Sequence, residues 1–360
     1  MINKQRLINT FCDLVKIDSP SGEEDEIASF LSKRLTELGF NILTDNYGNI
    51  IAKIGEGNTL MLSAHMDTVE PGRNIQPIVD KDLIKSKEKT ILGGDCKAGI
   101  AAILEGVESA FESNKEKRNL EIVITRDEEP GLLGAKNLDY SLINSKESLV
   151  FDGNGPVNTV TGISPTYIKF DITITGIGAH AGVEPEKGLS AIKIATELIN
   201  ELPQGRLDEE STFNVGIISG GTVRNAVPVE ATINGEFRSQ NTETLDLLYL
   251  QLDNSINSFQ KKYDKSKIDL KTEVMFEMYK LNENSNIVKS VFKSLKTLDL
   301  IPNIKPSGGG TDANIMLSHG IDCIEVGMAT NEMHTVDEYV VIPDLVDAAK
   351  LCELQITNNE

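Results

Sequence analysis

The chain of 360 residues contains no tryptophan, only four histidines and only four cysteines. The cysteines have neither the spacing of a metal site nor the density of a disulfide scaffold, which indicates a reducing, cytoplasmic environment. We find no run of about 18 apolar residues and no apolar signal core, so we expect neither a membrane-spanning helix nor a secretion signal. Positive charge is also scarce, since 35 lysines and arginines face 55 aspartates and glutamates, a net charge of −20. This imbalance argues against nucleic acid or an anionic membrane as a partner.

The order of the predicted elements indicates two domains, which suits a chain of this length. Residues 1–163 and 277–360 alternate apolar strands with amphipathic helices, a pattern typical of a doubly wound, largely parallel α/β sheet. Residues 164–276 follow the order βαββαβ instead, which is typical of a two-layer α+β unit. We therefore predict that the second domain is inserted into the first. In doubly wound sheets, ligands bind beyond the carboxyl ends of the strands.

Two local patterns predict where helices begin near those strand ends. The segment Ser21-Gly-Glu-Glu24 has the form of a capping box and predicts a helix over residues 22–38. The segment Gly93-Gly-Asp-Cys-Lys-Ala-Gly99 is a glycine-rich loop that opens a predicted helix over residues 98–110.

Two adjacent carboxylates, Glu128 and Glu129, follow a predicted strand at 120–125. Neighbouring carboxylates repel each other unless a positive charge lies beside them. A divalent metal ion bound by one of them, with the other left free to move a proton, would use both. An acidic loop exposed to solvent is the simpler alternative for an isolated pair, because such loops are common.

This pair is not isolated, because four further ligand-type side chains lie just past predicted strands or in the loops after them: His65, Asp95, Asp152 and His334. Imidazole and carboxylate together suit zinc, with manganese or cobalt as substitutes. With Glu129 the set has five members, too many for one tetrahedral ion. Five ligands suit two ions about 3.5 Å apart that share one carboxylate, although each residue on its own could be structural.

The two remaining histidines differ in setting. His180 lies in the glycine-flanked segment Gly176-Ile-Gly-Ala-His-Ala-Gly182 of the second domain. His319 ends a predicted helix, where the helix dipole favours it, and we interpret it as structural.

Eight short motifs occur in order along nearly the whole chain: Ser-Ala-His65-Met-Asp67-Thr, Gly-Gly-Asp95-Cys-Lys-Ala-Gly, Asp-Glu128-Glu129-Pro-Gly, Phe-Asp152-Gly, Gly-Ala-His180-Ala-Gly, Gly-Gly-Thr-Val-Arg-Asn225-Ala-Val-Pro, Gly-Gly-Thr-Asp312 and Glu-Met-His334-Thr. Together they resemble the dizinc exopeptidase family of peptidase T, carnosinase and aminoacylase, and in particular its peptidase T-like branch. The resemblance implies two zinc ions per subunit. Asp95 would bridge them, His65 and Asp152 would complete one site, and Glu129 and His334 the other.

The resemblance also implies how the neighbouring residues act. Glu128 would be the general base that takes a proton from the attacking water and passes it to the leaving amine. Asp67 would orient the His65 imidazole. In relatives the peptide bond after the bridging aspartate is cis, so we expect a cis bond between Asp95 and Cys96.

The resemblance gives the inserted domain a role in dimerisation and in substrate binding. It implies an isologous homodimer formed through this domain, with His180 reaching the metal site of the opposite subunit. His180 and Asn225 would polarise the scissile carbonyl, and Arg238 would anchor a substrate carboxylate. Gly309 and Gly310 would let the backbone approach the substrate.

Two departures from the family pattern bear on specificity. Cys96 stands where peptidase T-like sequences often carry a second acid, and Gly308 stands where the family's tripeptidases usually carry arginine, which leaves tripeptide specificity open. We predict a two-zinc aminopeptidase acting on short peptides. The alternative is a dizinc deacylase or carboxypeptidase-like amidohydrolase acting on N-acyl amino acids. A catalytically silent dimeric binding protein would require the loss of ligands or base, and all of them are present.

Overall fold

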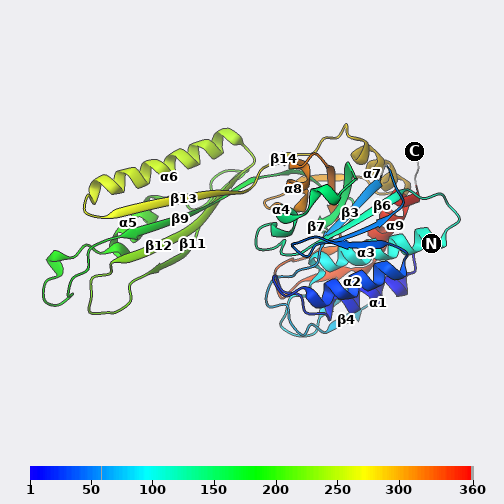
Figure 1. Cartoon of the computed structure of the whole chain (residues 1–360), viewed down its shortest axis with the longest axis horizontal. Helices are drawn as coiled ribbons and strands as arrows, with labels where there is room; N and C mark the ends of the chain where they lie inside the picture. The colour runs from blue at the N-terminus through cyan, green and yellow to red at the C-terminus, as the bar shows by residue number, and fades with distance from the viewer. Residues whose placement is uncertain (58, 358–360) are drawn as a thin grey trace. The chain divides into compact units, whose positions relative to one another are not determined.

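The structure, a computed structural model, describes residues 1–57 and 59–357 and divides into two compact units. The first unit comprises Met1–Gly162, Lys280–Pro306 and Thr311–Glu360. The inserted unit comprises Ile163–Tyr279 together with the short segment Ser307–Gly310 (Figure 1). That segment joins the inserted unit through hydrogen bonds, because Ser307 N–H donates to the Ile163 carbonyl at 2.8 Å.

A nine-stranded sheet forms the centre of the first unit, in the order β1-β2-β6-β3-β7-β16-β8-β14, with β15 pairing β8. Strand β3 lies parallel to β6 and β7, and β16 lies parallel to β7, so the middle of the sheet is parallel as predicted. The strands are β1 (Asn41–Thr44), β2 (Ile50–Ile54), β3 (Thr59–His65), β6 (Asn119–Thr125), β7 (Glu147–Gly153), β8 (Thr159–Ser164), β14 (Tyr279–Lys280), β15 (Asn303–Pro306) and β16 (Asp322–Gly327).

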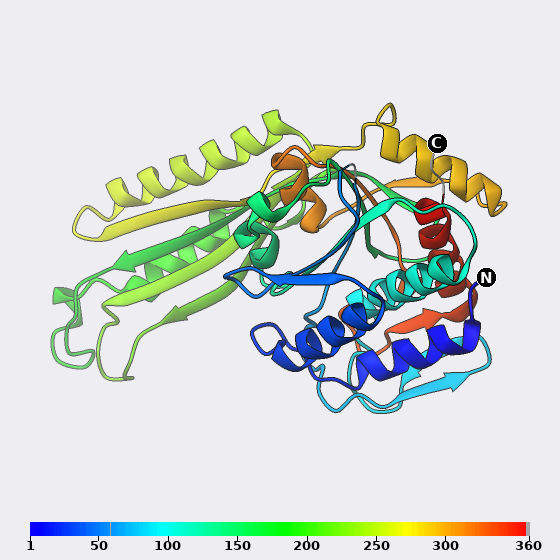
Figure 2. The ribbon, with the colours of Figure 1, turned by 45° about the vertical axis from the view of Figure 1, so that its right-hand side comes forward.

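Amphipathic helices cover this sheet because their apolar stripes are buried against it. Helix α1, for example, buries five apolar residues at helical spacing, and it lies beside α3 (Figure 2). Helix α3 also packs against α9. The helices of this unit are α1 (Lys4–Val15), α2 (Asp25–Glu37), α3 (Gly94–Glu112), α4 (Leu133–Asn137), α7 (Asn286–Thr297), α8 (Asp312–Ser318) and α9 (Ile342–Thr357), with a short 3-10 helix at Tyr140–Leu142.

The start of helix α2 differs from its prediction. Helix α2 begins at Asp25, and its N-cap residue Glu24 makes no side-chain capping bond. The capping-box prediction for Ser21 is therefore wrong. The Ser21 hydroxyl donates instead to the Asp67 carboxylate at 2.7 Å, a tertiary contact that competes with local capping.

A second, four-stranded sheet was not predicted, because its strands are only two to four residues long. Its order is β17-β18-β5-β4, and all its pairs are antiparallel. The bounds are β4 (Pro77–Asp80), β5 (Leu83–Ser86), β17 (Thr330–Asn331) and β18 (Tyr339–Val341). Strands β17 and β18 form a hairpin, so residues 332–338 are its connecting loop.

The inserted unit is a five-stranded antiparallel sheet in the order β10-β11-β12-β9-β13, with helices α5 and α6. Alternate residues of β9 are buried, so one face of the sheet carries the core of this unit. The chain order is βαββαβ with the short β10 added, which confirms the predicted two-layer unit. The elements are β9 (Thr166–Thr175), α5 (Ala191–Glu201), β10 (Gly205–Arg206), β11 (Ser211–Gly220), β12 (Glu230–Ser239), α6 (Thr242–Lys262) and β13 (Lys267–Phe276), with a short 3-10 helix at Pro185–Lys187.

Candidate metal centre

The five predicted metal ligands come together beyond the carboxyl ends of the parallel strands. His65 is the last residue of β3, and Asp152 lies at the end of β7. Asp95 lies in the first turn of α3, and Glu129 follows β6. His334 lies in the loop of the β17–β18 hairpin. Because β3 lies between β6 and β7, the sheet order alone brings three of the five segments to neighbouring positions.

The Asp95 carboxylate lies between two imidazoles. Its Oδ1 is 3.2 Å from His65 Nε2, and its Oδ2 is 3.0 Å from His334 Nε2. His65 Nε2 is also 3.3 Å from Asp152 Oδ1, and His334 Nε2 is 3.1 Å from Glu129 Oε1. The ligand-type atoms therefore form two groups, and Asp95 belongs to both.

Burial makes this concentration of carboxylates costly without a cation. Desolvation raises the pKa of Asp152 well above its usual range, and burial also raises the pKa of Glu129. The Glu129 Oε1 atom is buried and accepts no hydrogen bond, although His334 Nε2 is near. The hydrogen bond to Asp95 and the nearby Glu129 carboxylate raise the pKa of His334 to about 10.

The residues present fit two divalent metal ions. Carboxylate oxygens and imidazole nitrogens are ligands that zinc accepts, and the buried Glu129 Oε1, which accepts no hydrogen bond, is available as a ligand atom. Two groups that share one carboxylate match the arrangement of a two-ion site.

Cys96 lies in one of these groups but is engaged elsewhere. Its Sγ donates to the Phe151 carbonyl at 2.7 Å, and burial raises the pKa of the thiol well above its usual range. The peptide bond between Asp95 and Cys96 is cis, which confirms the prediction.

Asp67 makes contacts that the sequence did not reveal. His65 Nδ1 lies 3.0 Å from the Asp67 backbone carbonyl and 3.3 Å from Asp67 Oδ1, an arrangement that suits the predicted orienting role. The same carboxylate also accepts hydrogen bonds from the backbone N–H groups of Glu128 at 2.9 Å and Glu129 at 3.2 Å. Asp67 therefore holds both the imidazole and the loop that carries the two glutamates.

Glu128 is 7% exposed and lies beside the ligand group. Burial raises its pKa well above the usual range, and the charge of Asp152 adds to this effect, while the His65 charge opposes it. The loop is also tied down from behind, since the buried Glu24 carboxylate accepts from Asp127 N–H at 3.1 Å and pairs with Arg126 at 2.7 Å.

Two buried acids near this centre were missed as functional residues. Asp312 belongs to one of the eight motifs, but no role was predicted for it. It is 2% exposed, accepts a hydrogen bond from the Thr125 hydroxyl, and has a second oxygen with no partner. Burial raises its pKa to about 6. Glu338 accepts three backbone hydrogen bonds from the loop that carries Asp95, and only its closeness in sequence to His334 could have drawn attention to it.

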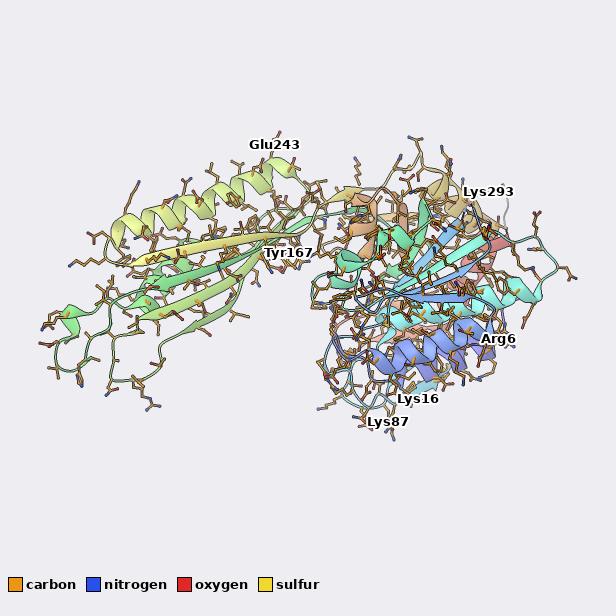
Figure 3. All side chains as sticks on the ribbon, viewed as in Figure 1. Arg6, Lys16, Lys87, Tyr167, Glu243 and Lys293 are labelled. Atoms are coloured by element: carbon orange, nitrogen blue, oxygen red, sulfur yellow. The ribbon has the colours of Figure 1, made fainter. Side chains whose placement is uncertain are left out.

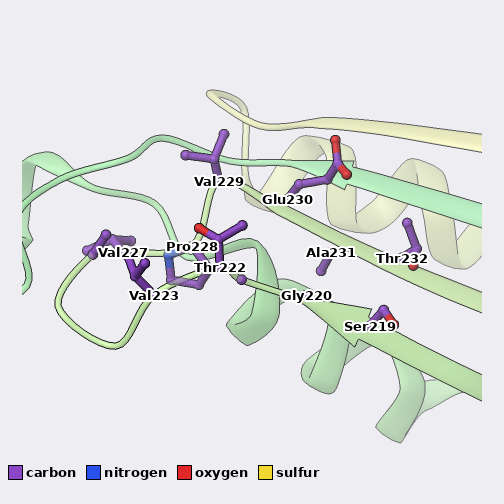
Figure 4. A pocket seen from close by; sticks show the side chains of 12 residues that line it. Ser219, Gly220, Thr222, Val223, Val227, Pro228, Val229, Glu230, Ala231 and Thr232 are labelled. Atoms are coloured by element: carbon purple, nitrogen blue, oxygen red, sulfur yellow. The ribbon is translucent and has the colours of Figure 1, made fainter.

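In the inserted unit, His180 and Asn225 lie in adjacent segments. Ala181 N–H donates to the Asn225 carbonyl at 3.0 Å, and His180 forms an isolated antiparallel β-bridge with Ala226. The loop that carries Asn225 also lines a pocket of about 330 Å³, in which Thr222, Val223, Val227 and Pro228 are among the lining residues (Figure 4).

Arg238 is held by three neighbours within the inserted unit. Its Nε and Nη2 each donate to the Glu236 carboxylate at 3.1 Å, and its Nη1 donates to the Gly308 carbonyl at 3.2 Å. Its guanidinium lies 4.3 Å from the ring centre of Tyr167, which is labelled in Figure 3. Gly309 is next to these donors, and Gly310 lies against the Phe276 ring.

The fold and this centre define a metallo-exopeptidase, and comparison with known proteins agrees. Residues 165–264 match the family profile described as peptidase dimerisation domain, and residues 49–155 match peptidase family M28. The chain is 34% identical to the uncharacterized protein YqjE of Bacillus subtilis, over 98% of this chain and 97% of that protein. It is 25% identical to peptidase T of Listeria welshimeri, over 97% of each chain.

Two solved structures of peptidases are similar to this chain in both sequence and fold. The aminopeptidase PepT of Bacillus cereus is 34% identical with a TM-score of 0.86, over 99% of this chain and 98% of that one. A tripeptidase of Staphylococcus aureus is 33% identical with a TM-score of 0.90, over 98% of each chain. The chain therefore belongs to the peptidase T-like family of metallopeptidases, which confirms the resemblance. Among the described residues, no helix is long and apolar enough to cross a membrane.

Proposed function

We propose that this metallo-exopeptidase removes the N-terminal residue from short peptides with the help of two zinc ions. The observation that carries the proposal is the Asp95 carboxylate, which belongs to two ligand groups at once. His65 and Asp152 would hold one ion, and Glu129 and His334 the other. When bound, the ions would polarise the scissile carbonyl and lower the pKa of the attacking water.

Glu128 would move the proton. It is buried beside the ligand groups, and its own backbone is fixed by Asp67. A carboxylate beside the ions could take a proton from the attacking water and then deliver it to the leaving amine. Asp67 would meanwhile keep the His65 ring in one orientation.

The enzyme would work as a homodimer assembled through the inserted unit. Support comes from the match of residues 165–264 to a dimerisation domain. Among the described residues, β10 pairs with Thr212 and Phe213 of β11, and no other strand pairs with this outer edge of β11. Ile217 and Ile218 on this stretch are 61% and 48% exposed. Open apolar edges tend to be covered by another chain. His180 and Asn225 would stabilise the developing oxyanion, with His180 acting on the site of the opposite subunit.

Substrate selection would depend on the cluster around Arg238. We propose that its guanidinium contacts the carboxylate end of the substrate and that Gly309 and Gly310 let the substrate approach the backbone. Both short peptides and N-acyl amino acids end in a carboxylate, so this cluster suits either class. All four cysteines are free thiols, which supports a cytoplasmic location.

A turnover screen of the zinc-loaded protein separates the two substrate classes. Di- and tripeptides with free N-termini should be cleaved, and the same peptides with acetylated N-termini should not. Preferential hydrolysis of N-acyl amino acids would replace the aminopeptidase proposal with the deacylase alternative. Cleavage of dipeptides without cleavage of tripeptides would indicate that Gly308, which stands in place of the family's arginine, removes the activity on tripeptides.

A further inference from the structure

The Glu338 side chain contacts the backbone at the N-terminal end of α3, the helix that carries Asp95. Its carboxylate is 2% exposed. One oxygen accepts from the backbone N–H groups of Leu92 at 2.6 Å and Gly93 at 2.7 Å, and the other accepts from Asp95 N–H at 3.0 Å. These three N–H groups belong to the turn that leads into the regular part of the helix, because Asp95 and Cys96 have non-helical backbone angles. Buried backbone N–H groups need acceptors, and Glu338 supplies them to this turn from a distant segment.

Glu338 and His334 belong to the same short loop, residues 332–338, between β17 and β18. The loop thus contacts the Asp95 segment twice. His334 Nε2 is 3.0 Å from the Asp95 side chain, and Glu338 holds the Asp95 backbone. The loop also contains two residues in the left-handed region, Glu332 at φ +55° and His334 at φ +63°. Side chains disfavour this region, so the conformation persists only where surrounding contacts enforce it.

We propose that Glu338 is a positioning residue for the metal centre, an inference that rests on the proposed two-ion function. By joining the loop that carries His334 to the backbone of Asp95, it fixes how far apart these two ligands lie before any ion arrives. A site whose ligands are already placed spends less binding free energy on ordering them. Glu338 therefore sets metal affinity, in addition to any contribution it makes to the stability of the fold.

Glu338→Gln is the direct test, because the amide keeps the shape of the side chain. It retains one acceptor oxygen, but its NH2 group faces backbone N–H donors that then lack an acceptor. Glu121→Gln is the matched control. Glu121 is fully buried and also holds a loop backbone, since it accepts from Asn144 N–H at 3.0 Å and Ser145 N–H at 2.7 Å. It lies near the start of β6, whereas Glu128 and Glu129 follow the end of that strand.

Metal-free protein is titrated with zinc against a chromophoric chelator, and thermal unfolding of the same samples is recorded. We expect Glu338→Gln to raise at least one zinc dissociation constant by on the order of 10- to 100-fold. This is the usual effect of removing a residue that holds a metal ligand in place by hydrogen bonds. Glu121→Gln should lower the melting temperature and leave zinc affinity as in the wild type. Wild-type zinc affinity in Glu338→Gln, together with a loss of stability like that of the control, would overturn the inference.

Two further arms keep the result interpretable. If Glu338→Gln does not fold, Glu338→Asp keeps the charge but shortens its reach, and it should show the same loss of affinity. A wild-type chain that takes up a single ion would contradict the two-ion proposal. The same comparison of Glu338→Gln with Glu121→Gln would then support or overturn this inference by the affinity for that one ion.

Discussion

Asp67 accepts a hydrogen bond from the backbone N–H of Glu128 at 2.9 Å. The same carboxylate accepts from Glu129 N–H and lies 3.3 Å from His65 Nδ1. One fully buried side chain thereby contacts a proposed metal ligand of β3 and fixes the backbone of the proposed base and of a proposed metal ligand that follows β6. Asp67 therefore contacts both the His65 imidazole and the backbone of Glu128 and Glu129.

We expect Asp67→Asn to lower turnover or metal affinity by on the order of 10- to 100-fold, because the amide cannot accept both backbone hydrogen bonds and still face the imidazole. Steady-state kinetics and a zinc titration measure this. Asp45→Asn is the control, since Asp45 also accepts backbone hydrogen bonds, from Tyr47 and Gly48 at 2.9 Å each, but contacts no proposed ligand. Equal losses in both variants would reduce Asp67 to a stabiliser of the fold.

Metal content tests the shared role of Asp95. Zinc-loaded and desalted protein should contain about two ions per chain by elemental analysis. A chelator should abolish activity, and added zinc should restore it. One ion per chain in fully loaded, active protein would contradict the two-ion site.

Glu128 and Glu129 are adjacent but should respond differently to the same change. Glu128→Gln should keep both ions and lower turnover by on the order of 10² to 10⁴, the scale of general acid–base catalysis. Glu129→Gln should instead lose affinity for one ion. Metal loss in Glu128→Gln, with metal retained in Glu129→Gln, would reverse the two assignments.

The neighbouring glycines of the inserted unit should also separate. A Cβ at Gly310 would lie 2.4 Å from the Phe276 ring, so Gly310→Ala should destabilise the protein by about 1–3 kcal/mol, as overpacking does. A Cβ at Gly309 meets nothing closer than 3.9 Å. Gly309→Ala should therefore leave the melting temperature unchanged and raise KM if the substrate passes along this backbone. An unchanged KM would remove Gly309 from the substrate site.

Subunit mixing tests whether His180 acts across a dimer. A His180→Ala chain and a Glu128→Gln chain should each be nearly inactive alone. If His180 serves the opposite subunit, a heterodimer contains one site with both changes and one with neither, so up to half of its sites recover. Recovery is measured as turnover per heterodimer after mixing. Confirmed heterodimers without recovery, or a fully active monomer, would rule out the role across the interface.

Much of this protein follows from its sequence. The alternation of strand and helix patterns predicted the α/β sheet, and the change of pattern after residue 163 predicted an inserted α+β unit. The residue types at or just past strand ends, His65, Glu129 and Asp152 among them, predicted a metal centre, because carboxyl ends of parallel strands meet at one edge. These inferences succeed because periodicity and side-chain chemistry are local properties, which a linear sequence records.

Only the tertiary structure showed which residues contact the segments that carry the proposed ligands. Strands β17 and β18 have two and three residues, too few to show a period, so the hairpin that presents His334 and Glu338 left no pattern to detect. The hydroxyl of Ser21 contacts Asp67 rather than its own helix. The Glu338 carboxylate meets backbone N–H groups 243 to 246 positions away. The contacts of Glu338 involve backbone N–H groups, which nearly every residue carries, so residue identity does not encode them. Sheet order and hairpin register bring them together.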